Sequence, residues 1–288
     1  AKNNQSKAAV INEKLIRECI YIAPPPGGEE DRTKNRNDRN EKQDRLRQLA
    51  QTMELSGVQC LMFSYRYLAR IDNLYGMDNI TKLHLDNNNI TKIENVSHLK
   101  QLRWLDLSFN KIKEIEGLDE LTQLEDLSLF SNQITVIRGL DNLSKLTCLS
   151  LGKNEIESLD ETAKYLHKLY QSLRMLTLQG NRVEQQAHYR TRMLAYLPNL
   201  KFLDNRLIVN DDIQKACEEQ RENLLPINEE DAQREAEAKR EAEERQTIAD
   251  YKRFNCPNEV KFLEELYRLQ PEGRPVVQML EMEDVSER

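Results

Sequence analysis

The sequence lacks the features that mark a membrane-bound or secreted protein. Its hydrophobic fraction is 39%, below the average of about 45–50% for soluble domains. No stretch approaches the roughly 18 apolar residues that a membrane span requires. The N-terminal residues contain no signal-peptide core, because Lys14, Arg17 and Glu18 interrupt their only apolar stretch. We therefore expect a chain that buries a core in one part and is strongly solvated in another.

Cysteine and histidine are few and scattered. The cysteines are odd in number and have no close spacing, which indicates reduced, buried thiols in the cytosol rather than a disulfide framework; they are Cys19, Cys60, Cys148, Cys217 and Cys256. No histidine stands at a metal-binding distance in the sequence from a cysteine or from another histidine; the four are His84, His98, His167 and His188. The sequence therefore predicts no metal site.

Signatures of catalysis are missing as well. The chain has no glycine-rich phosphate loop, no nucleophile elbow and no His-Glu-x-x-His motif. Its carboxylates are abundant, but they stand in solvated patterns rather than in acid–base pairs. A net charge of −7 argues weakly against nucleic acid as the main partner. We therefore predict no enzyme, no cofactor, and no nucleic-acid or membrane partner.

What the chain does contain is a repeat of 22 residues. Each copy reads Leu-x-Leu-x-x-Asn-x-Ile-x-x-Ile, with Leu in place of the last Ile in the fourth copy, and the copies begin at Leu83, Leu105, Leu127 and Leu149. One such unit cannot bury its own apolar face, so the copies must stack into a curved solenoid. This pattern predicts an α/β leucine-rich-repeat solenoid with short parallel strands.

The parts of each repeat can be assigned from their chemistry. The Leu-x-Leu pair predicts a short strand with alternate side chains pointing inward, and the Asn should turn inward to satisfy loop backbone groups. The remainder of each repeat supplies further inward leucines and should form a short helix or 3₁₀ turn. Leu61 begins a degenerate first repeat, with Arg66 in the Asn position. The interval from Leu149 to Leu176 is 27 residues, which predicts a true α-helix in that repeat.

The repeats divide the chain into three parts. Residues 1–60 should hold N-terminal helices, a charged tether and a solenoid cap, with Asn12 as an N-cap. Residues 61–204 should hold the repeats and a C-terminal cap. Residues 205–288 should form a charged helical or coiled-coil extension, because 229–245 carries eight acidic and four basic side chains, including Glu-to-cation pairs four residues apart such as Glu241–Arg245.

The outward strand positions supply the candidate binding site. Trp104 is the only tryptophan of the chain, and it should point out of the sheet because Leu105 points inward. Interfaces favour such aromatic anchors. The candidate partner-binding residues on the concave face are Trp104, Asp106, Asp126, Phe130 and Asp86.

Several strings resemble one family. Trp104-Leu-Asp-Leu-Ser-Phe-Asn110 and Leu124-Glu-Asp-Leu-Ser-Leu-Phe130, with Gly117-Leu-Asp119 and Leu149-Ser-Leu-Gly152, are similar to the subunit 3 family of the nexin–dynein regulatory complex. The resemblance covers residues 9–210 well and the tail loosely. It implies a leucine-rich-repeat and coiled-coil subunit of a ciliary or flagellar axonemal complex that links doublet microtubules and regulates dynein. It also implies hetero-oligomeric partners, namely the other subunits, inner-arm dynein and doublet microtubules, and a chain longer than these 288 residues.

A second reading keeps the repeat class and changes the role. The chain would then be a soluble regulator, such as a leucine-rich-repeat regulatory subunit of protein phosphatase 1 or an outer-arm dynein light chain. Those relatives mostly lack a long charged extension and a lead of 60 residues before the repeats. Both features are present here, which favours the axonemal subunit.

Overall fold

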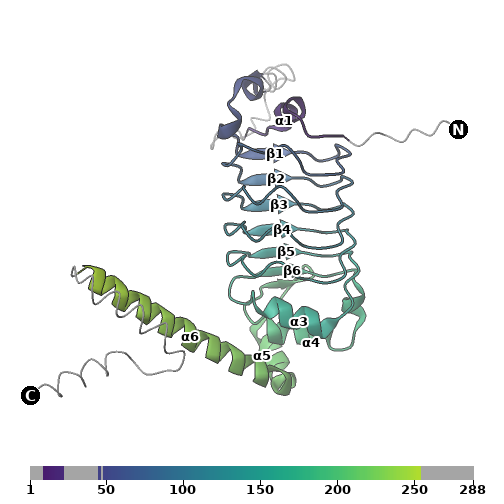
Figure 1. Cartoon of the computed structure of the whole chain (residues 1–288). Helices are drawn as coiled ribbons and strands as arrows, with labels where there is room; N and C mark the ends of the chain where they lie inside the picture. Colours follow the sequence, from purple (N-terminus) through teal and green to yellow (C-terminus); the bar gives the residue numbers. More distant parts are fainter. Residues whose placement is uncertain (1–8, 23–44, 47, 254–288) are drawn as a thin grey trace, which may run out of the picture. The chain divides into compact units, whose positions relative to one another are not determined.

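The structure is a computed structural model that describes residues 9–22, 45–46 and 48–253. The chain forms two compact units, residues 1–221 and residues 222–288, and each is described by itself. The first unit is a solenoid in which short strands stack one above another, with α1 (Glu13–Cys19) at one end and further helices at the other (Figure 1). None of the helices in the described part of the chain is both long and apolar enough to cross a bilayer.

The strands form one sheet whose order follows the sequence. Neighbours from β1 to β7 are parallel, and only the last pair is antiparallel. The strands are β1 Cys60–Met62, β2 Lys82–His84, β3 Trp104–Asp106, β4 Asp126–Ser128, β5 Cys148–Ser150, β6 Met175–Thr177, β7 Phe202–Leu203 and β8 Arg206–Leu207. The predicted leucine-rich-repeat solenoid is confirmed, and β1 shows that the repeats begin at the degenerate copy.

The core is a stack of leucines. The inward residue of each strand pairs in register with its counterpart on the next, and no member of the stack is more than 2% exposed; the members are Leu61, Leu83, Leu105, Leu127, Leu149, Leu176 and Leu203. Burying one such side chain contributes about 1.5–3 kcal/mol. The repeats are therefore held together mainly by apolar burial between neighbours.

A second buried column is polar. In each repeat the asparagine side chain turns inward, as predicted, and its carboxamide joins two adjacent repeats; the column is Asn88, Asn110, Asn132, Asn154 and Asn181. The Asn110 Oδ1 atom accepts the Ile90 N–H at 3.0 Å, and its Nδ2 donates to the carbonyls of Leu85 and Leu107 at 3.0 Å each. These contacts satisfy loop backbone groups that the solenoid buries away from water.

The back of each regular repeat is not helical. Of the two predicted forms, a short helix or a 3₁₀ turn, residues 96–102 and 118–124 adopt the second, as successive turns. The Leu121 N–H donates to the Leu118 carbonyl and the Leu124 N–H to the Leu121 carbonyl, each at 2.9 Å. Such i to i−3 bonds are of the 3₁₀ type, and a 22-residue repeat leaves too few residues for a longer run.

The longer repeat does contain a helix, as its spacing predicted. Helix α3 (Leu159–His167) begins after Ser158, whose hydroxyl accepts the Glu161 N–H. The 3₁₀ helix η2 (Arg182–Gln185), α4 (Tyr189–Tyr196) and the β7–β8 hairpin follow it and close the stack. The Tyr189 hydroxyl donates to Asp204 at 2.8 Å, which fixes α4 to the hairpin.

Helix α5 (Asn210–Glu219) belongs to the first unit. It packs on α4, where the Arg192 guanidinium donates to the Gln220 side chain at 3.0 Å. The sequence division after Asp204 therefore differs from the structural one after Arg221. The two divisions differ because a sparse apolar face holds α5 to the first unit. Ala216 on this face is buried, although the face contains few large apolar residues.

The other end of the stack is closed by the N-terminal lead. Asn12 caps α1, as predicted, by accepting the Leu15 N–H at 2.9 Å. Ile20 then bridges to Leu61 of β1, so the lead covers the outer edge of the first strand. The second predicted helix is present at residues 45–46 and 48–52, followed by the 3₁₀ helix η1 (Leu55–Gly57). Most of the predicted tether lies outside the described residues.

The second unit contains α6 (Arg221–Arg253), which begins at the last residue of the first unit. Between residues 228 and 247 its only apolar side chains are alanines. The predicted pair Glu241–Arg245 is present, with 2.8 Å between nitrogen and oxygen. A helix that is polar all round depends on such pairs rather than on a buried face. The rest of the predicted extension, residues 254–288, lies outside the described part of the chain, and a coiled coil stays a prediction.

Candidate protein-binding face

The outward face of the sheet holds every residue predicted for partner binding. In β3 only Leu105 is buried, while Trp104 and Asp106 keep partial exposure, so Trp104 points outward as the alternation predicted. Asp86 and Phe130 follow β2 and β4 by two residues, and Asp126 begins β4. We call this surface the strand face.

Aromatic rings gather on the strand face in two pairs. The Trp104 ring lies 4.0 Å from the His84 ring between centroids, and the Phe130 ring lies 5.5 Å from the Phe109 ring in an edge-on arrangement. Because Trp104 and Phe130 are outward residues of adjacent repeats, the sequence alone favours one aromatic patch for both. The structure instead places them at opposite ends of their strands, each with its own ring partner.

Phe130 is held flat by a glycine that sequence reasoning did not single out. A Cβ atom on Gly152 would stand 2.9 Å from the Phe130 ring, so the ring lies directly against the glycine backbone. The Lys153 ammonium sits 5.4 Å from the centroid of the same ring, within the range of a cation–π contact. The signal for this contact was available, because Gly152 occupies the register position that Asp86 and Phe130 occupy in earlier repeats.

Phe109 is exposed on a left-handed backbone. Its φ is +55°, and it stands in a column of positive-φ residues that follow the strands; the column is Tyr65, Asn87, Phe109, Ser131, Lys153 and Gly180. Asparagine and glycine tolerate this region, whereas a bulky side chain there is strained by about 1–3 kcal/mol. Tyr65 and Phe109 nevertheless carry aromatic rings that are 70% and 48% exposed. Rings kept in water on a strained backbone are features of a contact surface rather than of a core.

Three carboxylates cross the strand face in a diagonal line. Asp86, Asp106 and Asp126 stand on consecutive repeats, each two positions earlier along its repeat than the one before. We call them the acidic row. Asp86 accepts hydrogen bonds from the Ser64 hydroxyl at 2.6 Å and from the Asn87 amide at 2.8 Å, and Asp106 accepts the Ser108 N–H at 2.9 Å. The carboxylates are thus held in place by neighbouring donors.

Burial and neighbouring charges shift the pKa values of groups in and beside the row. Partial burial raises the pKa of the Asp126 carboxyl, and the neighbouring Asp106 charge raises it further, against a hydrogen bond from Cys148. Burial lowers the pKa of His84, although Asp106 and Asp86 act in the opposite direction. Around neutral pH the face therefore presents negative charge beside neutral rings.

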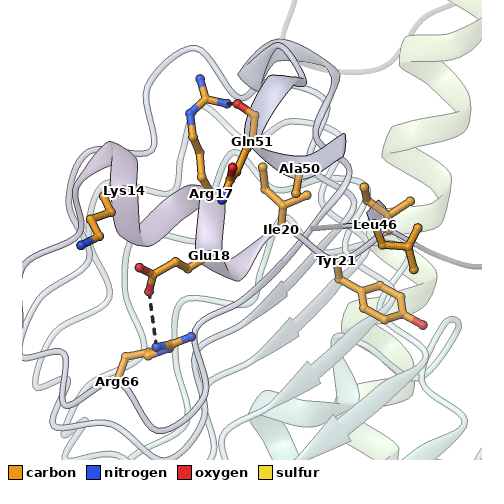
Figure 2. A pocket seen from close by; sticks show the side chains of 10 residues that line it. Lys14, Arg17, Glu18, Ile20, Tyr21, Leu46, Ala50, Gln51 and Arg66 are labelled. Carbon is orange, nitrogen blue, oxygen red and sulfur yellow. Dashed lines mark hydrogen bonds and ion pairs between the residues drawn. The ribbon is translucent and has the colours of Figure 1, made fainter. Parts of the chain in front are cut away.

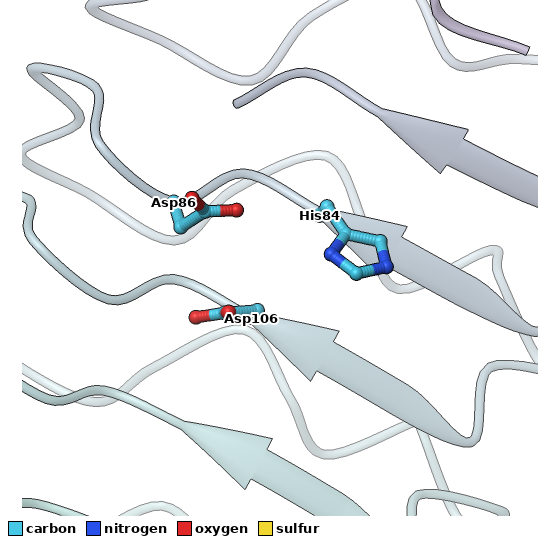
Figure 3. Close-up of side chains that lie close together, drawn as sticks. All are labelled: His84, Asp86 and Asp106. Carbon is cyan, nitrogen blue, oxygen red and sulfur yellow. The ribbon is translucent and has the colours of Figure 1, made fainter. Parts of the chain in front are cut away.

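Part of the row also has the donor types of a metal site. His84, Asp86 and Asp106 can each turn one ligand atom to a common point, with these atoms within 4.8 Å of one another, and Figure 3 shows the three side chains on β2, β3 and the loop after β2. Imidazole and carboxylate ligands suit a divalent transition metal. The spacing of cysteines and histidines along the chain could not find this group, because its members come from two adjacent strands.

A cavity of about 800 Å³ lies at the other end of the molecule, between α1 and residues 46–51 (Figure 2). Arg17, Glu18 and Arg66 of its lining hold the N-terminal lead in place. Arg17 donates to Glu13 and to the carbonyls of Gln51 and Met53, while Arg66 pairs with Glu18 at 3.8 Å. Three of the charged groups around this cavity therefore have structural partners.

The sequence profile described as "Leucine-rich repeat" matches residues 77–225, just over half of the chain. The chain belongs to the leucine-rich-repeat family. Domains of this family are typically non-catalytic protein-binding modules, and nothing in the described residues shows an enzymatic activity. A comparison with curated proteins finds no match.

Solved leucine-rich-repeat structures are similar to parts of the chain. In the Drosophila melanogaster SNF/U2A′ complex, one chain is 26% identical, with a TM-score of 0.39, over 56% of this chain and 81% of that one. The internalin InlF from Listeria monocytogenes is also 26% identical, with a TM-score of 0.43, over 52% of this chain and 48% of that one. The functional domain of InlJ from the same bacterium is 24% identical, with a TM-score of 0.40, over 54% and 35%. The match therefore spans about half or less of each internalin chain.

Proposed function

We propose that the chain is a non-catalytic structural subunit of the axonemal nexin–dynein regulatory complex. In this role it would link neighbouring doublet microtubules and regulate dynein-driven bending of cilia and flagella by binding other subunits. The proposal places the protein in the cytoplasm, at the axonemal cytoskeleton. The similarity of the strings at Trp104–Asn110 and Leu124–Phe130 to the subunit 3 family supports this choice.

The observation that carries the binding role is the strand face. It displays two aromatic pairs and three carboxylates on a sheet whose opposite side is fixed by the leucine stack. Rigid elements position interface residues with little loss of conformational entropy on binding. Trp104, Phe130 and the acidic row are the residues that we propose contact the partner.

Localisation tests the axonemal role. A tagged full chain expressed in a ciliated cell should concentrate in the axoneme and remain there after a salt wash. Loss of the protein should leave cilia assembled but beating abnormally. A diffuse cytosolic signal, with none of the protein in washed axonemes, would support a soluble regulator of the same repeat class and contradict the proposal.

Co-purification tests the binding face. Trp104→Ala should preserve the fold, because the side chain is outward, and should weaken partner capture by about 2 kcal/mol or more if Trp104 is a hot spot. Val136→Ala is a matched control, because Val136 is an exposed apolar residue in the turn after β4 rather than on the strand face. Equal recovery of both variants with the other subunits would show that the partner binds elsewhere.

A further inference from the structure

The acidic row differs in its partners from seven carboxylates on the loops of the solenoid. Each of these seven pairs with a Lys or Arg of the adjacent repeat; the pairs are Arg70–Glu94, Lys92–Glu116, Lys100–Glu120, Arg103–Glu125, Arg138–Glu114, Lys168–Asp141 and Arg182–Glu157. None of Asp86, Asp106 and Asp126 forms a salt bridge with any residue that the structure describes. Ion pairs between adjacent repeats therefore occur on the loops but do not include the three carboxylates of the strand face.

Without a cationic partner, the carboxylates of the acidic row repel each other in the isolated chain. Asp126 is partly buried beside Asp106, and like charges at short distance destabilise each other. A cation supplied by another molecule would remove the repulsion and provide the missing partner. Charge complementarity thus predicts that a partner covering this face carries positive charge.

The pairing of residues on neighbouring strands indicates which kind of cation fits this face. His84 pairs in register with Asp106, and Trp104 pairs in register with Asp126, so two carboxylates each stand beside an aromatic ring on the neighbouring strand. A planar guanidinium can stack on a ring and present its forked N–H groups to an adjacent carboxylate. A lysine ammonium is a compact point charge that cannot form the same bidentate contact.

A metal ion fits the row less well. Both oxygens of Asp86 already accept hydrogen bonds from protein donors, and Asp126 lies outside the group that could converge on one ion. The tryptophan beside Asp126 also offers nothing to an ion that prefers imidazole and carboxylate ligands. A row that is extended across three strands matches an extended partner better than a single ion.

We infer that the acidic row receives arginine side chains of a protein partner, with the rings of His84 and Trp104 stacking on the guanidinium groups. This inference rests on the proposed binding role of the strand face and specifies its partner as a segment that carries at least two arginines. The face would discriminate against a lysine-bearing segment of the same charge.

Trp104 is the only tryptophan of the chain, so its fluorescence reports directly on this site. The full chain is titrated with a dodecapeptide of alternating Arg and Gly, and in parallel with the Lys–Gly and Glu–Gly versions. The Arg peptide should change the Trp104 emission with saturation, and should bind about tenfold more tightly than the Lys peptide. The Glu peptide should give no saturable change.

Charge-removing variants assign the effect to the row. Asp106→Asn retains an oxygen for the Ser108 N–H and should weaken binding of the Arg peptide by about tenfold. Asp126→Asn should act similarly. Glu120→Gln is the matched control, because its carboxylate is on a loop and pairs with Lys100, and it should bind as the unaltered chain does.

Four results would overturn the inference. Equal binding of the Arg and Lys peptides would remove the role of the rings, and unchanged binding by both Asn variants would remove the role of the row. A response of Trp104 to micromolar zinc chloride, lost in Asp106→Asn, together with no response to the Arg peptide, would make the group a metal site instead. If the Asn variants lose the Arg peptide yet co-purify normally from axonemes, the inference is contradicted and the scaffold role stands.

Discussion

At the residue scale, the buried asparagines show how much a single repeated side chain contributes. Each carboxamide satisfies backbone groups on two adjacent repeats, and none of the buried side-chain nitrogen or oxygen atoms in the described part of the chain lacks a partner. The inward position of these asparagines was predictable from the sequence, because loop backbone groups that are buried beside the leucines need hydrogen-bond partners. The number and identity of their bonds depend on the spacing of neighbouring repeats, which the sequence does not state.

Asn110→Ala should lower the free energy of unfolding by about 1–3 kcal/mol, because it leaves the buried Ile90 N–H without an acceptor and removes one of the donors to each of the Leu85 and Leu107 carbonyls. Asn142→Ala is the control, since Asn142 is exposed and makes one bond of 3.3 Å to the Asp119 carbonyl. Chemical denaturation followed by circular dichroism measures both. Similar losses for the two variants would contradict the role of the asparagine column.

Asp126→Asn should stabilise the fold at pH 7, by up to about 1 kcal/mol. The pKa of Asp126 is raised by burial and by Asp106, so its ionised form is less stable in the folded chain than in the unfolded one. As pH falls through the raised pKa, the folded chain takes up the proton first and the penalty disappears. The gain should therefore shrink towards pH 4, and a gain that grew as the pH fell would contradict the assignment.

At the element scale, turns rather than helices shape the back of the repeats. Gly117 and Gly139 both have positive φ, and a Cβ on either would meet a backbone carbonyl of the preceding repeat. The sequence predicted the helix α3 from the spacing of its leucines, but it could not distinguish helix from turns in the shorter repeats. It did not predict that α5 packs on α4, because the sparse apolar face around Ala216 does not indicate which helix covers it.

Gly139→Ala should destabilise the solenoid more than Gly76→Ala does. Both glycines have similar positive φ, +72° and +78°, so the conformational penalty of about 1–2 kcal/mol is shared. Only at Gly139 would the new Cβ lie 2.6 Å from a carbonyl oxygen, that of Ile115, whereas Gly76 has open space. Thermal melts of the two variants measure the difference, and equal melting temperatures would show that adjacent repeats can move apart freely.

The binding face is also an element-scale property. Trp104, Asp106 and Phe130 were predictable as outward residues, because strand alternation follows from the leucines. The pairs His84–Trp104 and Phe109–Phe130 were not predicted, since they depend on contacts between strands and on a left-handed residue beyond the strand end. Phe109 could have been found from the repeat register, because it lies one residue beyond the outward positions that the strand alternation identifies in each copy.

At the scale of the whole molecule, the solenoid and the charged helix are separate in their energetics. The first unit has a continuous leucine stack, whereas α6 is polar around its circumference from residue 228 to residue 247. Stability in a solenoid arises from each repeat and its immediate neighbours. The repeats should therefore unfold independently of the tail.

A chain that ends at residue 228 should melt within about 2 °C of the full chain, since about 1 kcal/mol corresponds to 2–4 °C for a domain of this size. The truncation retains Leu224, the last apolar residue that is buried in the described part of the chain. Differential scanning calorimetry of the two chains, under identical buffer conditions, measures the shift. A fall of more than about 5 °C would show that the tail stabilises the repeats.

Both ends of the parallel stack are closed, and this limits how the molecule can assemble. The Tyr21 N–H donates to the Cys60 carbonyl at 3.1 Å and covers the first strand, while the last strand is a two-residue piece that includes the charged Arg206. An open stack of this kind could add strands from other copies indefinitely, in the manner of a fibril. The closed stack instead has a fixed length, so a high local concentration of the protein should not drive its sheets to join end to end.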